Sequence, residues 1–202
     1  MEDVKKFDIK VFDLVPDYLI DQVDDLLEDN ESNNRINDNR LLSNYSKERY
    51  SSKKDRIKYI VTLDKQSFPS DKQKVVGIVI VFKREIRFKD RLIQLGGIGG
   101  VGTKMEYRGK GIATNMLKVA KRLLEEVVCD VAYLDTDIND PVMLKLYGKI
   151  EFIILGRNHT YLGKSGKRYY ENDGMIAPIK SQEIFSEIMD DNKPFNIGQG
   201  NW

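Results

Sequence analysis

The sequence predicts a mixed α/β fold of the α+β kind: a single domain, residues 1–202, with a twisted, mostly antiparallel sheet and helices on both of its faces. Two observations lead to this fold class. Stretches with strand-like and helix-like spacing of apolar residues follow one another in a mixed order, which favours a mixed sheet covered by helices. The chain also shows no internal repeat and no linker-like break, and its length suits one domain.

The first part of the chain predicts a strand followed by an acidic amphipathic helix. Residues 7–15 alternate apolar and polar positions, which predicts the strand. Pro16 stands at a plausible helix start, and apolar residues recur at helical spacing over 19–27. The other face of this helix is acidic over 17–29. It is either a solvated face or a wall beside a site for a cationic substrate. Residues 30–44 are rich in Asn, Asp and Ser and predict a loop.

The rest of the chain alternates between strand and helix patterns. Two long apolar stretches joined through Lys89 and Asp90 are typical of a hairpin, and the segment after Gly109 keeps a period of 3.6 residues. In chain order we expect a short helix at 41–50, a strand at 56–63, a polar turn at 66–74, strands at 75–88 and 92–103, helices opening at Gly109 and Pro141, and strands at 131–134, 152–155 and 175–179. The segment 175–179 is expected to be the last sheet strand.

Composition excludes several classes of protein. The 33 basic and 32 acidic residues give a net charge of +1, which is not the basic field of a general nucleic-acid binder. A single cysteine and a single histidine exclude an intramolecular disulfide and a multi-histidine metal site, so no metal is expected. Cys129 is expected in buried packing and His159 in a loop. No signal peptide or apolar span is visible, which predicts a cytoplasmic protein without a membrane partner.

Two glycine patterns stand in the centre of the chain. The first, residues 97–102, matches the dinucleotide-binding spacing G-x-G-x-x-G. That motif requires a helix to open within the glycine run, whereas five residues, 103–107, intervene here. The second pattern, Arg108–Ala113, opens a strong amphipathic helix. Its glycines allow close approach of a ligand, and the free amides of a helix start bind phosphate well. The second pattern therefore favours a phosphate site.

At these residues the chain resembles the GCN5-related N-acetyltransferase (GNAT) superfamily. Arg108-x-x-Gly111-x-Ala113 matches the motif Q/R-x-x-G-x-G/A of that superfamily. The segment 146–152 resembles its L-Y-x-x-x-G-F, although Glu151 replaces the usual glycine and puts the local turn in doubt. The resemblance extends over most of residues 75–155, with the motifs in the same order.

The resemblance implies an acyltransferase that uses acetyl-CoA as its cosubstrate. In this superfamily the pantetheine arm pairs with a strand edge, and glycines at 99, 100 and 102 are expected to keep that edge open. The pyrophosphate is held by amide groups of the following loop. The implied cofactor-binding residues are Val101, Gly102, Thr103, Arg108, Gly109, Lys110, Gly111, Ile112 and Ala113.

A more distant similarity points to the aminoglycoside 2'-N-acetyltransferase branch. It rests on the long hairpin 79–101, the acidic strand entry 171–174 and the tryptophan at the end of the chain. Three positions depart from that branch, because Gly99, Asn172 and Asn201 stand where it has carboxylates. The similarity implies substrate-binding roles for Gly99, Asp135, Asn172 and Asp173.

These resemblances imply transfer of an acetyl group to a primary amine of a small molecule. An aminoglycoside-like cationic acceptor would link the protein to antibiotic resistance. A protein or peptide acceptor and a non-catalytic acyl-CoA-binding module remain the alternatives, and a homodimer remains an open assembly state. A test of thiol release with a panel of amines would separate the enzyme from the module.

The reaction needs a general acid and a base. Tyr147 matches the superfamily tyrosine that donates a proton to the departing sulfur, and the amide of Val101 is a candidate donor to the acetyl carbonyl. Asp135 and the carboxylate of Trp202 are the first candidates for the base, ahead of Asp137, Glu171 and Asp173. Trp202 either folds back over the acceptor site or is a frayed terminus.

Overall fold

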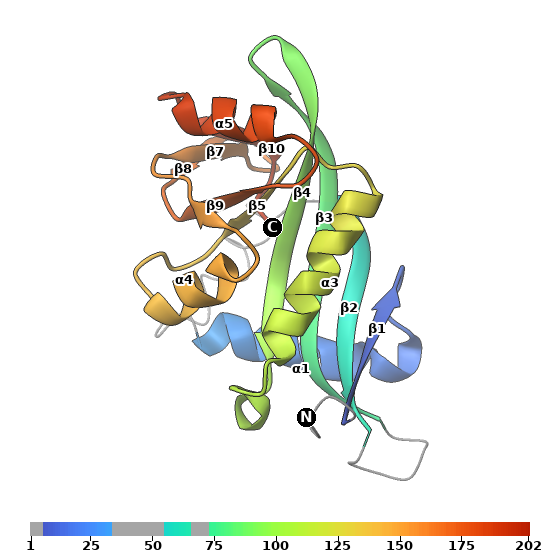
Figure 1. Cartoon of the computed structure of the whole chain (residues 1–202). Helices are drawn as coiled ribbons and strands as arrows, with labels where there is room; N and C mark the ends of the chain where they lie inside the picture. Colours follow the sequence, from blue (N-terminus) through green and yellow to red (C-terminus); the bar gives the residue numbers. More distant parts are fainter. Residues whose placement is uncertain (1–5, 34–54, 66–72) are drawn as a thin grey trace.

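The computed structural model describes residues 6–33, 55–65 and 73–202 and contains a seven-stranded sheet in the order β1-β2-β3-β4-β5-β9-β6 (Figure 1). Its strands are β1 (Phe7–Phe12), β2 (Arg56–Asp64), β3 (Lys74–Phe88), β4 (Arg91–Thr103), β5 (Val131–Asp135), β9 (Gly174–Pro178) and β6 (Ile153–Ile154). Every neighbouring pair is antiparallel except β4 and β5. The predicted mixed, mostly antiparallel sheet is confirmed.

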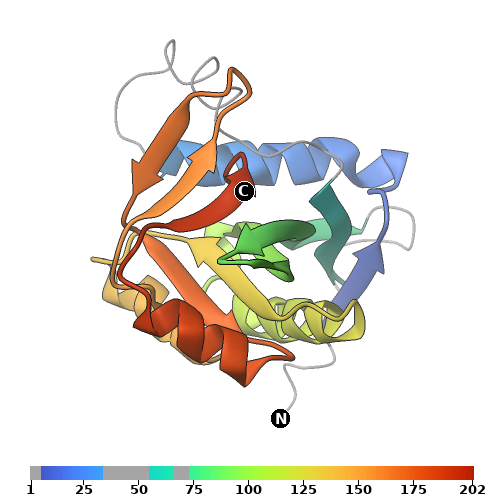
Figure 2. The ribbon, with the colours of Figure 1, turned by 90° about the horizontal axis from the view of Figure 1, so that it is seen from above.

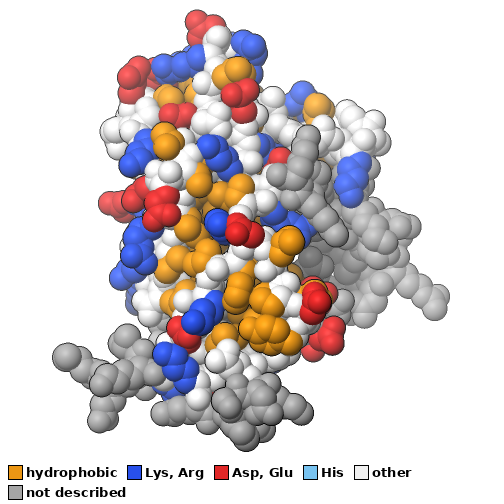
Figure 3. All heavy atoms as spheres, turned by 90° about the vertical axis from the view of Figure 1, so that its right-hand side faces the viewer, with side chains coloured by type: hydrophobic (Ala, Val, Ile, Leu, Met, Phe, Trp, Pro, Cys, Tyr) orange, Lys and Arg blue, Asp and Glu red, His pale blue; other side chains and the backbone are white. Residues whose placement is uncertain are grey.

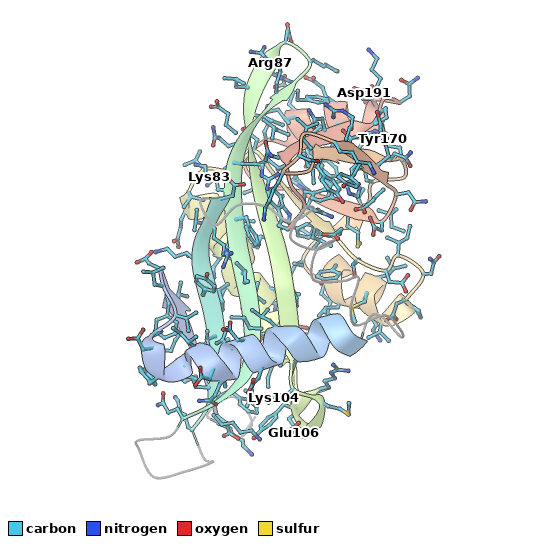
Figure 4. All side chains as sticks on the ribbon, turned by 180° about the vertical axis from the view of Figure 1, so that it is seen from behind. Lys83, Arg87, Lys104, Glu106, Tyr170 and Asp191 are labelled. Carbon is cyan, nitrogen blue, oxygen red and sulfur yellow. The ribbon has the colours of Figure 1, made fainter. Side chains whose placement is uncertain are left out.

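Helices cover both faces of this sheet. Helix α1 (Asp17–Asn33) crosses its back and α3 (Ile112–Glu126) lies along its front (Figures 1 and 4). The back core contains Leu19, Val23 and Leu26 of α1 with apolar residues of β3. The front core joins α3 and α4 (Pro141–Gly148) to the opposite side of the same strands. Burial of both faces explains why residues 75–82 are continuously apolar.

The loop predicted at 30–44 does not begin at residue 30, because α1 continues to Asn33. The remainder of that segment, the helix predicted at 41–50 and most of the turn predicted at 66–74 lie outside the described residues. The first strand ends at Phe12, three residues before the predicted end at Val15. The hairpin of β3 and β4, with its turn at Lys89 and Asp90, is confirmed.

A second sheet was not predicted. It has the order β10-β7-β8, from β7 (His159–Leu162), β8 (Arg168–Glu171) and β10 (Phe195–Gln199). The prediction that 175–179 is the last strand is therefore wrong, since α5 (Gln182–Asp190) and β10 follow it. Strand β10 pairs in parallel with β7, and this long-range pairing leaves no local pattern. Ser181, which caps α5 by accepting from the amide of Ile184, was the available signal.

The surface carries charges of both signs. On the face at the right of Figure 1, basic and acidic side chains are interspersed around hydrophobic patches (Figure 3). This mixed pattern agrees with the net charge of +1 and differs from the single-sign surface that steers polyanions. Among the described residues, no helix is both long and apolar enough to cross a membrane.

Candidate active site

Strands β4 and β5 separate in the middle of the large sheet. Their parallel register contains three pairs and ends at Gly97 and Tyr133. Just beyond this point β4 bulges, because Gly99 pairs with Ile80 whereas Gly102 pairs with Ile78. Gly100 lies in the bulge with a φ of 56°, a conformation that favours glycine. A bulge beside a separated strand turns backbone groups of β4 toward the gap, where an extended ligand can pair with them.

The loop after β4 is open to solvent and rich in backbone donors. Gly109 and Gly111 each have a φ of 77°, and a Cβ atom added to either would meet no atom within 4 Å. Gly111 is the N-cap of α3, and no side chain in the described part of the chain caps that helix start. The first-turn amides are therefore available to an anion.

Charged and aromatic side chains support this loop. The Nε of Arg108 donates to the carbonyl of Thr103 at 3.2 Å. Lys110 lies over the ring of Tyr107 with Nζ 4.9 Å from the centroid, and the Tyr107 hydroxyl donates to Asp64 at 2.9 Å. Tyr107 thus anchors the loop to Asp64, the last residue of β2, while the side chains of Arg108 and Lys110 stay exposed. The contact of Arg108 with Thr103 thus joins the end of β4 to the loop at 108–113.

Tyr147 lies on α4 at the far side of the gap, and only 6% of it is exposed. Burial raises the pKa of its phenol well above the ordinary value of 10.0, the charge of Asp135 raises it further, and a hydrogen bond with Thr136 lowers it. The phenol therefore keeps its proton at neutral pH. Asp135 itself is the last residue of β5 and is half-buried. Asp135 thus lies near enough to Tyr147 for its charge to raise the pKa of the phenol.

Trp202 closes the other side of the gap. Its ring stacks on Phe82 with centroids 5.5 Å apart and meets Tyr133 edge-on at 6.2 Å. A Cβ atom at Gly97 would lie 2.2 Å from the ring, and one at Gly99 would lie 2.9 Å from the backbone carbonyl carbon of Trp202. Figures 1 and 2 show this end of the chain in the middle of the molecule. Trp202 is therefore packed in the interior, and the interpretation as a frayed terminus is wrong. Gly97 and Gly99 lie against Trp202, so they do not leave the strand edge free there, as was expected for Gly99.

A polar network joins the chain end to the end of β5. The amide of Asn201 donates to Asp135 and to Glu171, at 3.2 Å each, and the Tyr161 hydroxyl donates to Glu171 at 3.1 Å. The backbone N–H of Trp202 donates to the Asn201 side chain. Because the side-chain amide of Asn201 contacts two carboxylates, negative charge is concentrated beside Trp202.

His159 contradicts its expected place in a loop. It lies in β7 and is fully buried, with Nε2 3.5 Å from Glu171 and Nδ1 3.9 Å from Asp173. Pairing of β7 with both β8 and β10 brings it inside. The ligand atoms of these three residues lie within 4.8 Å of one another, close enough to hold a metal ion. Cys129 is buried, as expected, and burial raises the pKa of its thiol to about 11.

The remaining candidates lie at the rim. Asp173 is half-buried and its carbonyl accepts from the amide of Thr136. Asn172 is exposed in the turn between β8 and β9, and Asp137 is exposed after β5. Asp137 accepts from the amide of Asn139 at 2.9 Å, so it acts in a local turn.

Sequence reasoning missed Arg84 and Asp55. Arg84 of β3 is 8% exposed, pairs with Asp55 at 3.1 Å and lies 3.9 Å from the centroid of Trp202. The signal was available in the alternation of β3, because Arg84 shares its face with the apolar residues Phe82 and Ile86. An arginine in register with buried positions predicts an internal partner.

Separated central strands followed by an exposed glycine loop at a helix start are the arrangement that the resemblance to the acetyltransferase superfamily leads us to expect. Comparisons with known proteins agree with this. The family model of the acetyltransferase (GNAT) domain matches residues 19–139, more than half of the chain. The chain therefore belongs to the GNAT acetyltransferase family.

Individual relatives share the fold and part of the sequence. The structure of the NatC complex bound to Gag peptide and CoA has a TM-score of 0.57 at 16% identity, over 87% of this chain and 99% of that chain. The GNAT family N-acetyltransferase YhbS from Escherichia coli, in complex with CoA, has a TM-score of 0.55 at 14% identity, over 96% and 89%. N-alpha-acetyltransferase 30 from Saccharomyces cerevisiae is 32% identical over 88 residues, which cover 42% of this chain and 46% of that protein. The chain thus matches about half of the length of this relative.

Proposed function

We propose that the protein transfers the acetyl group of acetyl-CoA to a primary amine of a small cationic molecule by direct attack on the thioester. One observation carries the choice of acceptor. The carboxylates of Asp135 and Glu171 meet at the side chain of Asn201, beside Trp202, where β4 and β5 separate. Carboxylates gathered at the entrance of a site attract and hold ammonium groups.

The cofactor end is proposed to bind the thioester substrate through backbone groups. The amides of 108–113 would hold the pyrophosphate at the start of α3, and the edge of β4 at Val101, Gly102 and Thr103 would pair with the pantetheine arm. The amide of Val101, next to the bulge at Gly100, would donate to the acetyl carbonyl and stabilise negative charge as the amine attacks. Two CoA-bound neighbours of the same fold support this arrangement.

Tyr147 is the proposed general acid. Its buried phenol, with a pKa raised above the ordinary value, holds a proton that the thiolate leaving group takes up as the carbon–sulfur bond breaks. Asp135 is the proposed base that removes a proton from the ammonium group, because it lies near Tyr147 and receives a hydrogen bond from Asn201. A neutral amine is required, since an alkylammonium has a pKa of about 10 and no free electron pair.

Trp202 is the second proposed base. Its backbone carbonyl carbon lies beside Gly99, on the gap between the strands, and a chain that ends at this residue carries a carboxylate there. Appending one glycine to Trp202 moves that carboxylate and tests its role. Loss of turnover with unchanged acetyl-CoA affinity would support the Trp202 carboxylate, and full turnover would leave Asp135 as the base.

Two acceptor classes compete within this proposal. The aminoglycoside-like acceptor rests on Asp135, Glu171 and Asp173, which supply carboxylates. Gly99, Asn172 and Asn201 replace three of the carboxylates expected for that branch. A peptide acceptor is favoured by the likeness to N-alpha-acetyltransferase 30 and to the NatC complex bound to a peptide. We give preference to the small cation because its charge matches the carboxylates around Asn201.

An acceptor screen tests the proposal. The protein is incubated with acetyl-CoA and, separately, tobramycin, spermidine or a peptide with a free N-terminus, and both thiol release and the acetylated product are measured. We expect acetylated tobramycin or spermidine. Acetylation of the peptide alone would replace the proposed acceptor class. Binding of acetyl-CoA without turnover of any amine would support the non-catalytic module.

A further inference from the structure

Arg84 makes four contacts of three kinds, most of them with the last residues of the described chain. Its Nη1 donates to the carbonyls of Ile197 and Gly200 at 2.7 and 2.8 Å. Its Nη2 lies 3.1 Å from the carboxylate of Asp55, and its guanidinium lies 3.9 Å from the centroid of the Trp202 ring. Burial lowers the pKa of Arg84 to about 10, with Asp55 acting in the opposite direction. Arg84 therefore remains charged at neutral pH.

This position links a central strand to the acceptor side of the site. The two carbonyls that accept from Arg84 belong to the segment directly before Asn201 and Trp202. Asn201 in turn donates to Asp135, the proposed base. A planar guanidinium can serve two carbonyls, one carboxylate and one aromatic face at once, whereas an ammonium group is a single compact charge. The contacts therefore favour arginine over lysine at position 84.

We propose that Arg84, paired with Asp55, is a positioning residue that holds Trp202 and Asn201 where β4 and β5 separate and thereby sets the affinity for the acceptor. The kinetic part rests on the proposed function. The pair is more than a buried salt bridge. Arg84 also donates hydrogen bonds to the carbonyls of Ile197 and Gly200, and its guanidinium lies over the ring of Trp202. The contacts of Arg108 and Lys110 are with Thr103 and Tyr107 instead, so we expect acetyl-CoA affinity to be independent of the pair.

Trp202 provides a direct readout of this role, because it is the only tryptophan in the chain. Its intrinsic fluorescence and its quenching by acrylamide report on this one ring. The test variant is the double substitution Arg84→Met with Asp55→Asn, which removes both charges and leaves no unpaired buried ion. The variant Arg84→Lys keeps the positive charge but loses the planar guanidinium with its several donors. The matched control is Arg87→Met, an exposed arginine on the other face of β3 (Figure 4).

In the double variant we expect red-shifted emission and a several-fold larger acrylamide quenching constant, with native far-UV circular dichroism and unchanged acetyl-CoA affinity by calorimetry. Arg84→Lys should also show increased quenching, and Arg87→Met should match the parent protein. If Trp202 stays protected in the folded double variant, or if lysine restores full protection, the positioning role is wrong and the pair is only a charge bridge.

The kinetic measurement uses the amine with the highest turnover among tobramycin, spermidine and the peptide. We expect the KM for this amine to rise at least several-fold, and by a larger factor than kcat falls, while the KM for acetyl-CoA is constant. Equal loss of kcat and of acetyl-CoA affinity would contradict the proposal. If no amine is turned over, the proposed function fails, while the quenching result still decides whether Arg84 holds Trp202.

Discussion

The cofactor end and the acceptor end of the site are built in opposite ways. The cofactor end is one continuous segment, from the edge of β4 to the start of α3, and its loop glycines, Gly109 and Gly111, are open to solvent. The acceptor end gathers residues from β3, β5, β8 and the end of the chain around Trp202, and its glycines are in contact with that ring and backbone. One end depends on backbone groups and the other on packed side chains.

This difference explains what each end can recognise. Backbone amides at a helix start bind any phosphate of suitable shape, so the cofactor end suits a substrate common to the whole family. Packed side chains change shape with each substitution. We therefore propose that the acceptor end, with its Arg84, Trp202 and Asn201, determines the substrate preference of this chain. Substitutions at the two ends should separate these functions.

Replacement of Tyr147 by phenylalanine should have the largest effect. It removes the proposed proton donor and leaves the ring in place, so we expect kcat to fall by about 100- to 10,000-fold, the range typical of general acids. Acetyl-CoA affinity should stay within twofold, roughly 0.4 kcal/mol. Tyr170→Phe, at an exposed position on β8 (Figure 4), is the control. A kcat that is unchanged in Tyr147→Phe would exclude the acid role.

The substitution Gly111→Asp should weaken the binding of acetyl-CoA without disturbing the acceptor end. It adds a negative charge and a side chain at the helix start, so we expect acetyl-CoA affinity to fall by about 100-fold, or roughly 2.7 kcal/mol. Gly166→Asp is the matched control, because Gly166 has a φ of 84° and open space around it but lies in the β7–β8 turn. Calorimetry should show normal binding for the control, and normal binding for Gly111→Asp would refute the phosphate site.

The substitution Gly97→Ala should impair the use of the amine without changing the binding of acetyl-CoA. The new methyl group needs the space of the Trp202 ring, which lies 2.2 Å from its position. Displacement of the ring should lower kcat/KM for the amine by about 10- to 100-fold and leave acetyl-CoA affinity unchanged. Gly96→Ala is the control in the same strand, since its methyl group would meet Leu124 on the opposite face. Equal losses in both variants would show a general packing defect.

The pKa of Tyr147 predicts how activity depends on pH. Since burial raises this pKa above its ordinary value of 10.0, the acid form persists through the alkaline range. Measured at saturating acetyl-CoA, kcat/KM for the amine should rise as the amine loses its proton and should show no decline below about pH 10 from loss of the acid. A decline centred near pH 8 would contradict a buried, protonated Tyr147.

Sequence patterns could predict the fold class and the glycine-rich start of α3 because both depend on local signals. The hairpin turn at Lys89 and the helix start at Gly111 are each encoded within a few residues. The second sheet and the burial of His159 could not be predicted in this way, because β10 and β7 pair across more than thirty residues of sequence. The contact of Arg84 with Trp202 spans an even larger separation. Such contacts depend on the complete topology.

Glu151 lies three residues after the end of α4, the helix that carries Tyr147. Its replacement should have the smallest effect. Glu151 has a φ of 69°, so the turn forms although glycine is absent, at a cost typical of left-handed residues. Glu151→Gly relieves this strain but gives the unfolded chain more freedom, and the exposed ion pair with Lys121 contributes little. We therefore expect the free energy of unfolding to increase by about 0.5–1 kcal/mol.

Glu151→Ala separates strain from charge, because alanine also loses the ion pair with Lys121 but keeps the Cβ atom. Thermal unfolding should show a Tm about 1–4 °C higher for Glu151→Gly than for Glu151→Ala, as expected for a chain of this size. Turnover should be the same in both variants, since Tyr147 is held by its burial against Phe152 and α4. A Tm for the glycine variant no higher than that of the alanine variant would show that backbone strain at position 151 does not limit stability, whereas a parent Tm above both would assign the stability of this turn to the ion pair.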